Sequence, residues 1–354
     1  MKKSLIALAA LAAVSAASAQ STVTVSGAMV LAVGTTEIGT TTSDLQIARQ
    51  TGNIKFAATE DLGGGLKAGF ELTSTIGEGA TSNLTTTGLT AQRFNQLGSR
   101  GQNLTLSGGF GGILVGRADT GIRRQMGIAD VTGLSIVSGF SDGSSGASAS
   151  SAGKIAIAAG DANARIIYGD DFANMIAYTS PSMSGFNISL ATVPVQTVST
   201  GVGDDSVTKD TMSYSVNYSN GPMNASVNFT DAQGGTSPYQ ITTLVANYDL
   251  GVAKIGLAQQ SIRLDSGTNP GNGILVTAQV PMGNGWWGLG YGRRTATAST
   301  DANFAGDDVK QITVGYRYNL SKRTHLQAVY NTIDRSALTG TDLKETHIIL
   351  GHSF

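Results

Sequence analysis

Short segments in which apolar and polar residues alternate run through this chain of 354 residues, and they constrain its fold more than any other feature. In 211–218, TMSYSVNY, one parity reads Met, Tyr, Val, Tyr and the other reads Thr, Ser, Ser, Asn. The segments 22–33, 224–230 and 311–319 repeat the pattern. Because successive side chains of a strand point to opposite faces, the alternation predicts strands with one apolar and one polar face.

Seven short turn signals separate these segments. They lie at 60–67, 107–113, 180–187, 219–224, 248–254, 280–287 and 318–324. Each interval between them has room for two strands of about ten residues and a longer polar loop. Seven tight turns join fourteen strands in pairs, and one further strand at each end makes sixteen. Short turns at one edge and long loops at the other predict an all-β fold, a sixteen-stranded antiparallel barrel.

The composition favours a barrel in a membrane over a soluble sandwich. Charged residues make up only 13% of the chain, against about 25% in ordinary soluble domains. The net charge of −1 gives no basic stripe for a nucleic-acid partner, and the absence of cysteine excludes a disulfide scaffold. A transmembrane barrel puts the apolar parity in lipid and the polar parity around an aqueous lumen, with every backbone group paired laterally.

The two ends of the sequence carry further signals. Residues 1–19 combine Lys2 and Lys3 with an apolar run and a small-residue cleavage site, which predicts a signal peptide followed by a barrel over 20–354. The apolar run is too short to span a bilayer as a helix, which takes about 20 residues. At the other end, Ile348, Leu350 and Phe354 share a parity. We expect this parity to face lipid, with the aromatic ring at the membrane interface.

Six segments in order resemble the trimeric general porins of the Gram-negative outer membrane, of the β-proteobacterial kind. They are 59–72, 106–117, 174–187, 247–260, 315–330 and the GHSF terminus. The resemblance implies a homotrimer among outer-membrane lipid and lipopolysaccharide, with no cofactor. Each barrel would be a water-filled channel for passive diffusion of ions and small hydrophilic solutes. It also implies a third extracellular loop, here about 118–160, folded inward, and a C-terminal Phe354 that serves as an assembly signal.

In this family, wall arginines face acids of the third loop across a constriction, which sets the field in the pore. The residues that match these positions are Arg100, where the arginine is kept, and Asn53 and Asp171, where it is replaced. The loop supplies Asp130, with Arg117 and Asp119 at its root. Alternative interpretations stay open: Arg100 shares the parity of Leu104 and would then be a rim residue, and Asp130 would be a solvated acid.

Two departures from the family pattern bear on ion selectivity. Members with several wall arginines favour anions, because fixed positive charge in a narrow pore concentrates them. Asn53 removes one such charge and Asp171 reverses another. The sequence therefore predicts a pore that is weakly selective or leans toward cations.

Three rival functions differ from a general channel. A barrel hydrolase needs a nucleophile with a base in reach, and the three histidines all fall near the last two strands. They show no metal-binding spacing either. A substrate-specific channel needs a track of aromatic or arginine side chains, whereas aromatics are 6% of the chain. An adhesin or structural barrel would have a closed lumen.

Overall fold

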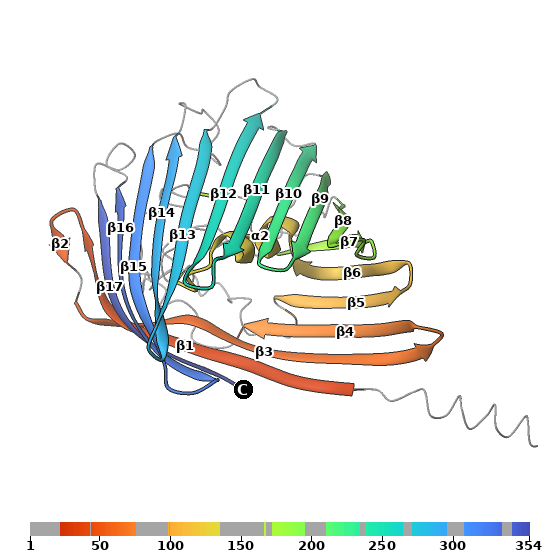
Figure 1. Ribbon diagram of the computed structural model, residues 1–354, viewed down its shortest axis with the longest axis horizontal. Coiled ribbons are helices and arrows are strands. Elements are labelled where there is room, and N and C mark those ends of the chain that lie inside the picture. Colours follow the sequence, from red (N-terminus) through yellow and green to blue (C-terminus); the bar gives the residue numbers. More distant parts are fainter. Residues whose placement is uncertain are drawn as a thin grey trace, which may run out of the picture.

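The computed structural model describes residues 22–42, 44–75, 98, 100–134, 166–167, 172–194, 210–233, 238–264, 271–295, 308–334 and 342–354. These residues form one antiparallel sheet that closes on itself where β17 pairs with β1 (Figure 1). Of its 17 strands, β2 (Thr41–Thr42) is a two-residue strand at a loop. The other strands form the predicted sixteen-stranded barrel, which is confirmed.

The wall begins with β1 (Thr22–Ile38), β3 (Gln46–Gly63), β4 (Leu66–Thr75), β5 (Gly101–Gly108), β6 (Gly111–Asp119), β7 (Phe172–Thr179), β8 (Phe186–Val193) and β9 (Asp210–Asn220). It continues with β10 (Met223–Gln233), β11 (Tyr239–Asp249), β12 (Lys254–Leu264), β13 (Asn272–Met282), β14 (Gly285–Thr295), β15 (Val309–Asn319), β16 (Thr324–Asp334) and β17 (Leu343–Ser353). The seven predicted turns join β3 to β4, β5 to β6, and so on to β15 and β16. In two of them, Gly221 and Gly283 adopt φ of 55° and 59°, which only glycine enters without strain.

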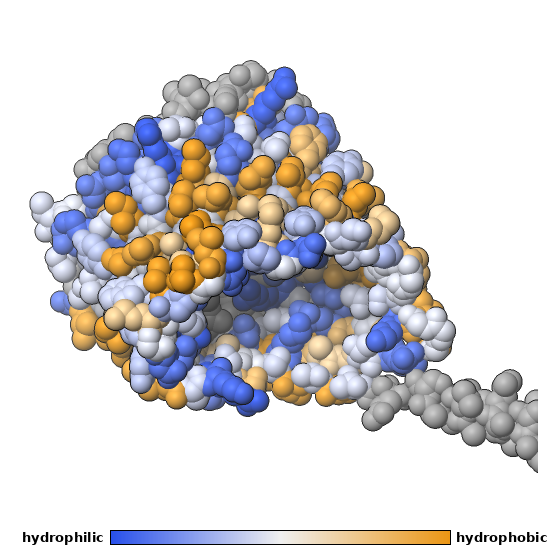
Figure 2. Space-filling model, in the orientation of Figure 1, coloured by the Kyte–Doolittle hydropathy of each residue, from blue (hydrophilic) through white to orange (hydrophobic). Residues whose placement is uncertain are grey.

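Side chains alternate between the two faces of the wall as the sequence predicts. In β17, Ile348 and Leu350 are 56% and 52% exposed on the outside, whereas Ile349 between them is fully buried on the inside. Figure 2 shows apolar residues gathered over the outer surface and polar residues along the visible hollow. Because closure pairs the backbone groups laterally, this apolar exterior is suited to lipid.

The C-terminal residue closes the seam between the first and last strands. The backbone N–H of Phe354 donates to the Gly27 carbonyl at 3.0 Å, and the Gly27 N–H donates back at 3.2 Å. The Phe354 ring covers Gly27, where a Cβ would lie 2.5 Å from the ring. The ring itself stays 50% exposed on the outer surface. The expected lipid-facing side for Phe354 therefore agrees with its position.

The third long connection folds inward, as expected, but its bounds and content differ from the sequence prediction. It runs from 120 to 171, between β6 and β7, rather than from 118 to 160. It also contains a helix, α2 (Gly121–Ala129), which the alternation pattern did not predict. Thr120 caps this helix by accepting a hydrogen bond from the Arg123 N–H. Among the described residues, no helix is long and apolar enough to cross a membrane.

Deleting Phe354 is expected to lower the yield of folded barrel, because it removes two seam hydrogen bonds and uncovers Gly27. Each such bond contributes about 1 kcal/mol. The measurement is heat-modifiable migration of the outer-membrane fraction relative to total exported protein. Phe354→Tyr keeps the ring and the backbone bonds and is the matched control. Equal amounts of folded barrel from the deletion and the control would contradict the prediction.

Candidate functional site

Loop three is defined as residues 120–171, and its described residues lie against the inner wall on one side of the barrel. Its helix α2 contacts β9 to β13 and lies on their inner side (Figure 1). The buried face of α2 carries Ile122, Met126 and Ala129. These residues pack on inward-facing apolar side chains of the wall, which are Ile241, Val245, Ala258, Ile262, Leu264, Leu275 and Val309. The inner wall under the loop therefore carries an apolar patch, with buried polar side chains such as Asn247 and Thr277 between its members.

Wall glycines let the loop backbone approach closely. A Cβ at Gly256 would lie 1.9 Å from the Ala129 carbonyl oxygen, so only glycine fits there. The same carbonyl accepts a hydrogen bond from Thr277 Oγ1 at 2.5 Å. The segment of loop three that contains Ile166 approaches Gly273 equally closely. A Cβ added at Gly273 would lie 2.0 Å from the Ile166 carbonyl oxygen. Two glycines of adjacent strands thus fix two points of the loop.

Arg294, on β14 of the wall, binds the same segment of loop three at Ile166. Its side chain is 2% exposed. Its Nε and Nη2 donate to the Ile166 carbonyl at 3.1 and 2.6 Å, and Nη2 also donates to Gln260 Oε1 at 2.8 Å. Nη1 donates to the Gly271 carbonyl at 3.4 Å. This buried cation is used to position the loop and is not available to solutes.

The opposite wall, formed by β3, β4 and β5, carries an inward-facing charged cluster. Lys55 pairs in register with Thr73, and Glu71 lies two residues before Thr73 on the same face. Lys55 Nζ lies 2.5 Å from Glu71 Oε2, and Thr73 Oγ1 donates to Glu71 Oε1 at 2.8 Å. The Arg100 guanidinium interacts coulombically with the same carboxylate. We call Lys55, Glu71 and Arg100 the wall cluster.

The predicted wall residues fall on different faces of the barrel. Arg100 acts electrostatically on the inward-facing Glu71, which favours the pore interpretation, but it continues the outward parity of Gln102 and Leu104, so its pore-lining role stays a prediction. Asn53 is also inward, because it shares the parity of Lys55 two residues later. Arg117 pairs with Gln102 and shares a parity with Val115, which is 51% exposed on the outer surface. This parity argues against a pore-lining role for Arg117, and Asp171 lies outside the described residues.

The predicted loop residues lie at the two ends of α2. Asp119 forms an ion pair with Arg123, whose Nε lies 3.4 Å from Oδ1. Asp130 follows the helix, and its Oδ1 accepts from the Thr132 N–H and hydroxyl at 2.9 and 2.5 Å. Its Oδ2 is buried without a hydrogen-bond partner among the described residues. Asp130 therefore shapes the turn that leads the loop along the wall, in addition to contributing negative charge.

Two charged residues of the lumen, Lys55 and Glu71, were missed by the sequence interpretation, and the face of Arg124 was left open. Lys55 and Glu71 lie on the inward parity of strands whose outward parity is apolar, and that alternation was sufficient to find them. Arg124 lies on the exposed side of α2, opposite the buried Ile122 and Met126. Its position depends on the helix, which was not predicted. Together they place charge on both sides of the lumen, on the wall and on the loop.

The comparison with known families is direct. The model of the Gram-negative porin family matches residues 7–338. The chain belongs to the Gram-negative porins. Outer membrane porin protein 32 of Delftia acidovorans is 35% identical over 347 residues, covering 92% of this chain and 88% of the relative. Major outer membrane protein P.IB of Neisseria meningitidis is 27% identical, covering 92% of this chain and 91% of the relative.

Solved porin structures agree with the barrel. An anion-selective porin from Comamonas acidovorans has a TM-score of 0.66 at 25% identity, covering 95% of this chain and all of that chain. The trimer form of OmpT of Vibrio cholerae has a TM-score of 0.59 at 12% identity, covering 94% of this chain and 99% of that chain. The predicted family, fold and outer-membrane location are therefore confirmed, and the chain is a channel-forming porin.

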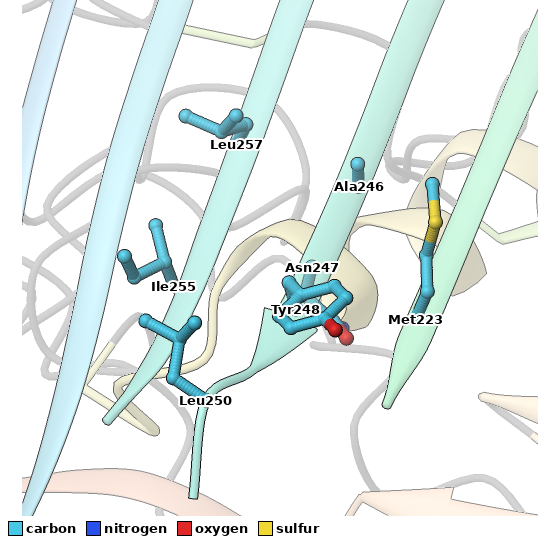
Figure 3. A pocket seen from close by; sticks show the side chains of 7 residues that line it. All are labelled: Met223, Ala246, Asn247, Tyr248, Leu250, Ile255 and Leu257. Atoms are coloured by element: carbon cyan, nitrogen blue, oxygen red, sulfur yellow. The ribbon is translucent and has the colours of Figure 1, made fainter. Parts of the chain in front are cut away.

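An apolar hollow on the porin lies outside this site. It has a volume of about 310 Å³ and is formed at the short-turn ends of β10 to β12. Figure 3 shows Tyr248, Leu250 and Ile255 around it, with α2 behind the strands. Tyr248 and Leu250 are 46% and 53% exposed on the outer surface. The hollow is therefore part of the lipid-facing surface, and the described residues include no cluster that could hold a metal ion.

Replacing Gly256 with Ala is expected to displace loop three, because the new Cβ would overlap the Ala129 carbonyl. Overpacking of this kind costs about 1–3 kcal/mol. The expected result is faster proteolysis within loop three and noisier single-channel currents. Gly112→Ala is the matched control, since its Cβ would meet only Ser107 Cβ at 3.8 Å. Indistinguishable currents and cleavage rates for the two variants would show that the glycine does not fix the loop.

Proposed function

We propose that this porin passes ions and small hydrophilic solutes through a constriction between α2 and the wall cluster. The observation that carries the proposal is the placement of charge on both sides of one lumen. Lys55, Glu71 and Arg100 project from one wall, and α2 presents Arg124 from the side that β9 to β13 support. The apolar face of α2 is used for anchoring, which leaves its charged face to the pore.

The site residues predicted from the sequence have different roles in this proposal. Arg100 is the kept wall arginine, and Asn53 lies beside Lys55 as a neutral polar group. Asp119 neutralises Arg123 at the root of the loop, and Asp130 turns the loop along the wall. Asp171 keeps its proposed place at the constriction only through its sequence position. Arg117 leaves the proposed constriction because of its outward parity.

The proposed ion preference differs from the sequence expectation. Asp119 shares the parity of Arg117 and pairs with Arg123, so the cations that remain among the described residues of the constriction are Lys55, Arg100 and Arg124, and the acids are Glu71 and Asp130. One positive charge is in excess, and Arg124 has no ion pair with these acids at contact distance. Charges across a narrow pore act over a Debye length of about 8 Å. We therefore infer a mild preference for anions, in line with the anion-selective porin from Comamonas acidovorans that the chain resembles.

Substitutions within the wall cluster are expected to move the reversal potential in opposite directions. Glu71→Gln removes the acid that Lys55 and Arg100 share, so anion preference should rise. Arg100→Ala removes a cation, so anion preference should fall. The measurement is the reversal potential of purified protein in a planar bilayer under a salt gradient.

Arg117→Ala is the control for these measurements, because Arg117 lies on the outward parity. It should leave the reversal potential unchanged while preserving heat-modifiable migration. A shift as large as that of Arg100→Ala would contradict the assignment of faces. Clear cation selectivity of the unmutated porin would contradict the proposed preference.

Export and assembly complete the proposal. Residues 1–19 act as the signal peptide, and the mature barrel assembles as a homotrimer in outer-membrane lipid with lipopolysaccharide. The trimer form of the Vibrio relative and the continuous apolar exterior support this assembly. Light scattering of the detergent-solubilised protein tests it: a mass of three chains is expected, and a monomer in mild detergent would refute it.

The porin is proposed to have no enzymatic activity of its own. The sequence contains one arrangement of the form G-x-S-x-G at 139–143, which in hydrolases marks a strand-to-helix elbow. Those residues lie in loop three, outside the described part, and the described segment before them, 131–134, is not a strand. An esterase assay on purified protein is expected to give only the background rate.

A further inference from the structure

A second polar cluster lies on the inner face of the barrel, at the short-turn end of β14, β15 and β16. Trp286 pairs in register with Arg317, and Arg317 pairs with Gln327. His325 pairs with Asn319 on the same face. Short turns of outer-membrane barrels lie on the periplasmic side. The cluster therefore lies between the constriction and the periplasm.

Loop three fixes the position of this cluster. Trp286 Nε1 donates to the Thr132 carbonyl at 3.0 Å, directly after the turn that Asp130 makes. The Arg317 Cζ lies 4.7 Å from the centroid of the Trp286 ring, and Arg317 Nε donates to Asn319 Oδ1 at 3.2 Å. A ring on one side and an amide on Nε hold the guanidinium in one orientation.

Arg317 differs from Arg293 and Arg294 of the neighbouring strand β14 in its partners. Arg293 has Asp308 at 3.0 Å, and Arg294 uses its nitrogens on backbone and Gln260 oxygens. Within the described part of the chain, Arg317 forms no ion pair, and its terminal nitrogens donate to no protein acceptor. Partial burial of a guanidinium that has no acidic partner costs free energy, and a bound anion would lower that cost.

Neighbouring side chains add neutral hydrogen-bonding groups beside the guanidinium. Gln327 and His325 are 5% and 8% exposed. Within the described residues, the Gln327 amide has no hydrogen-bond partner. The His325 ring packs against Gly351, where a Cβ would lie 2.2 Å from the ring. Gln327 lies directly opposite Arg317 in the strand register, and His325 lies two residues before Gln327 on the same inward parity, so both side chains neighbour Arg317 on the inner face.

We propose that Arg317, Gln327 and His325 form a carboxylate-binding subsite on the periplasmic side of the constriction. The planar fork of arginine donates two parallel hydrogen bonds to a carboxylate, which an ammonium group cannot match. Trp286 is the positioning residue that orients the fork. The subsite would hold small organic carboxylates briefly after they pass the constriction. The inference rests on the proposed channel function and names the solute class that the lumen favours.

The experiment measures single-channel conductance in potassium acetate and in potassium chloride over a range of concentrations. A binding site makes conductance saturate, and saturation at lower concentration in acetate than in chloride is expected for the unmutated porin. Arg317→Gln should raise the half-saturating acetate concentration about fivefold. Arg317→Lys keeps the charge and loses the fork, so it should behave like Arg317→Gln.

Lys254→Gln is the matched control. Lys254 lies at the same end of the barrel, in register with Gln279 on the inward parity, and removing it changes the lumen charge by the same amount. It should leave the saturation curve in acetate unchanged. Heat-modifiable migration of every variant establishes that the barrels are folded.

Two results would overturn the subsite. Restoration of acetate saturation by Arg317→Lys would show that only the field of the charge matters. Equal shifts of the half-saturating acetate concentration in Arg317→Gln and Lys254→Gln would also show that only the field of the charge matters. Absence of any conductance from the unmutated, folded protein would instead refute the channel function, so the two failures are distinguishable.

Discussion

Lateral pairing of the backbone is the constraint on which the rest of this porin depends. A strand edge cannot be exposed to lipid, because its N–H and C=O groups would find no water there. The seam between β1 and β17, completed by the mutual hydrogen bonds of Gly27 and Phe354, removes the last edge. Closure then forces the two faces of every strand into different solvents, lipid outside and water or loop inside.

The inner face of the wall both supports loop three and lines the pore, and different strands do each. On β11 to β13 it supports loop three, through apolar residues such as Val245 and Leu275 and through hydrogen bonds from Asn247 and Thr277. On β3 to β5 it is charged, because Lys55 and Glu71 face open lumen. The asymmetry of the pore therefore comes from which strands the loop covers. The loop contributes its own charge only on the side turned away from the wall.

Much of this architecture was readable from the sequence, and the exceptions have physical causes. Turn signals and alternation gave the strand count, and the same alternation would have found Lys55 and Glu71. Arg117 was selected by resemblance to a family motif, although its parity follows the outward-facing Val115. Helix α2 was missed because a single short helix in a β protein depends on a wall that supports its apolar face. The pairing of Trp286 with Arg317 needed the register between two strands, which local patterns do not contain.

The glycines beneath loop three have a consequence for how porins of this kind diverge. Gly256 and Gly273 leave room for two backbone carbonyls of the loop. Both glycines lie on strands that are far from the loop in sequence. The loop path is thus partly encoded in β12 and β13. A chimera that receives loop three from another porin would need this strand pair from the same donor. During evolution, pore calibre would be inherited as a two-part module rather than as a loop alone.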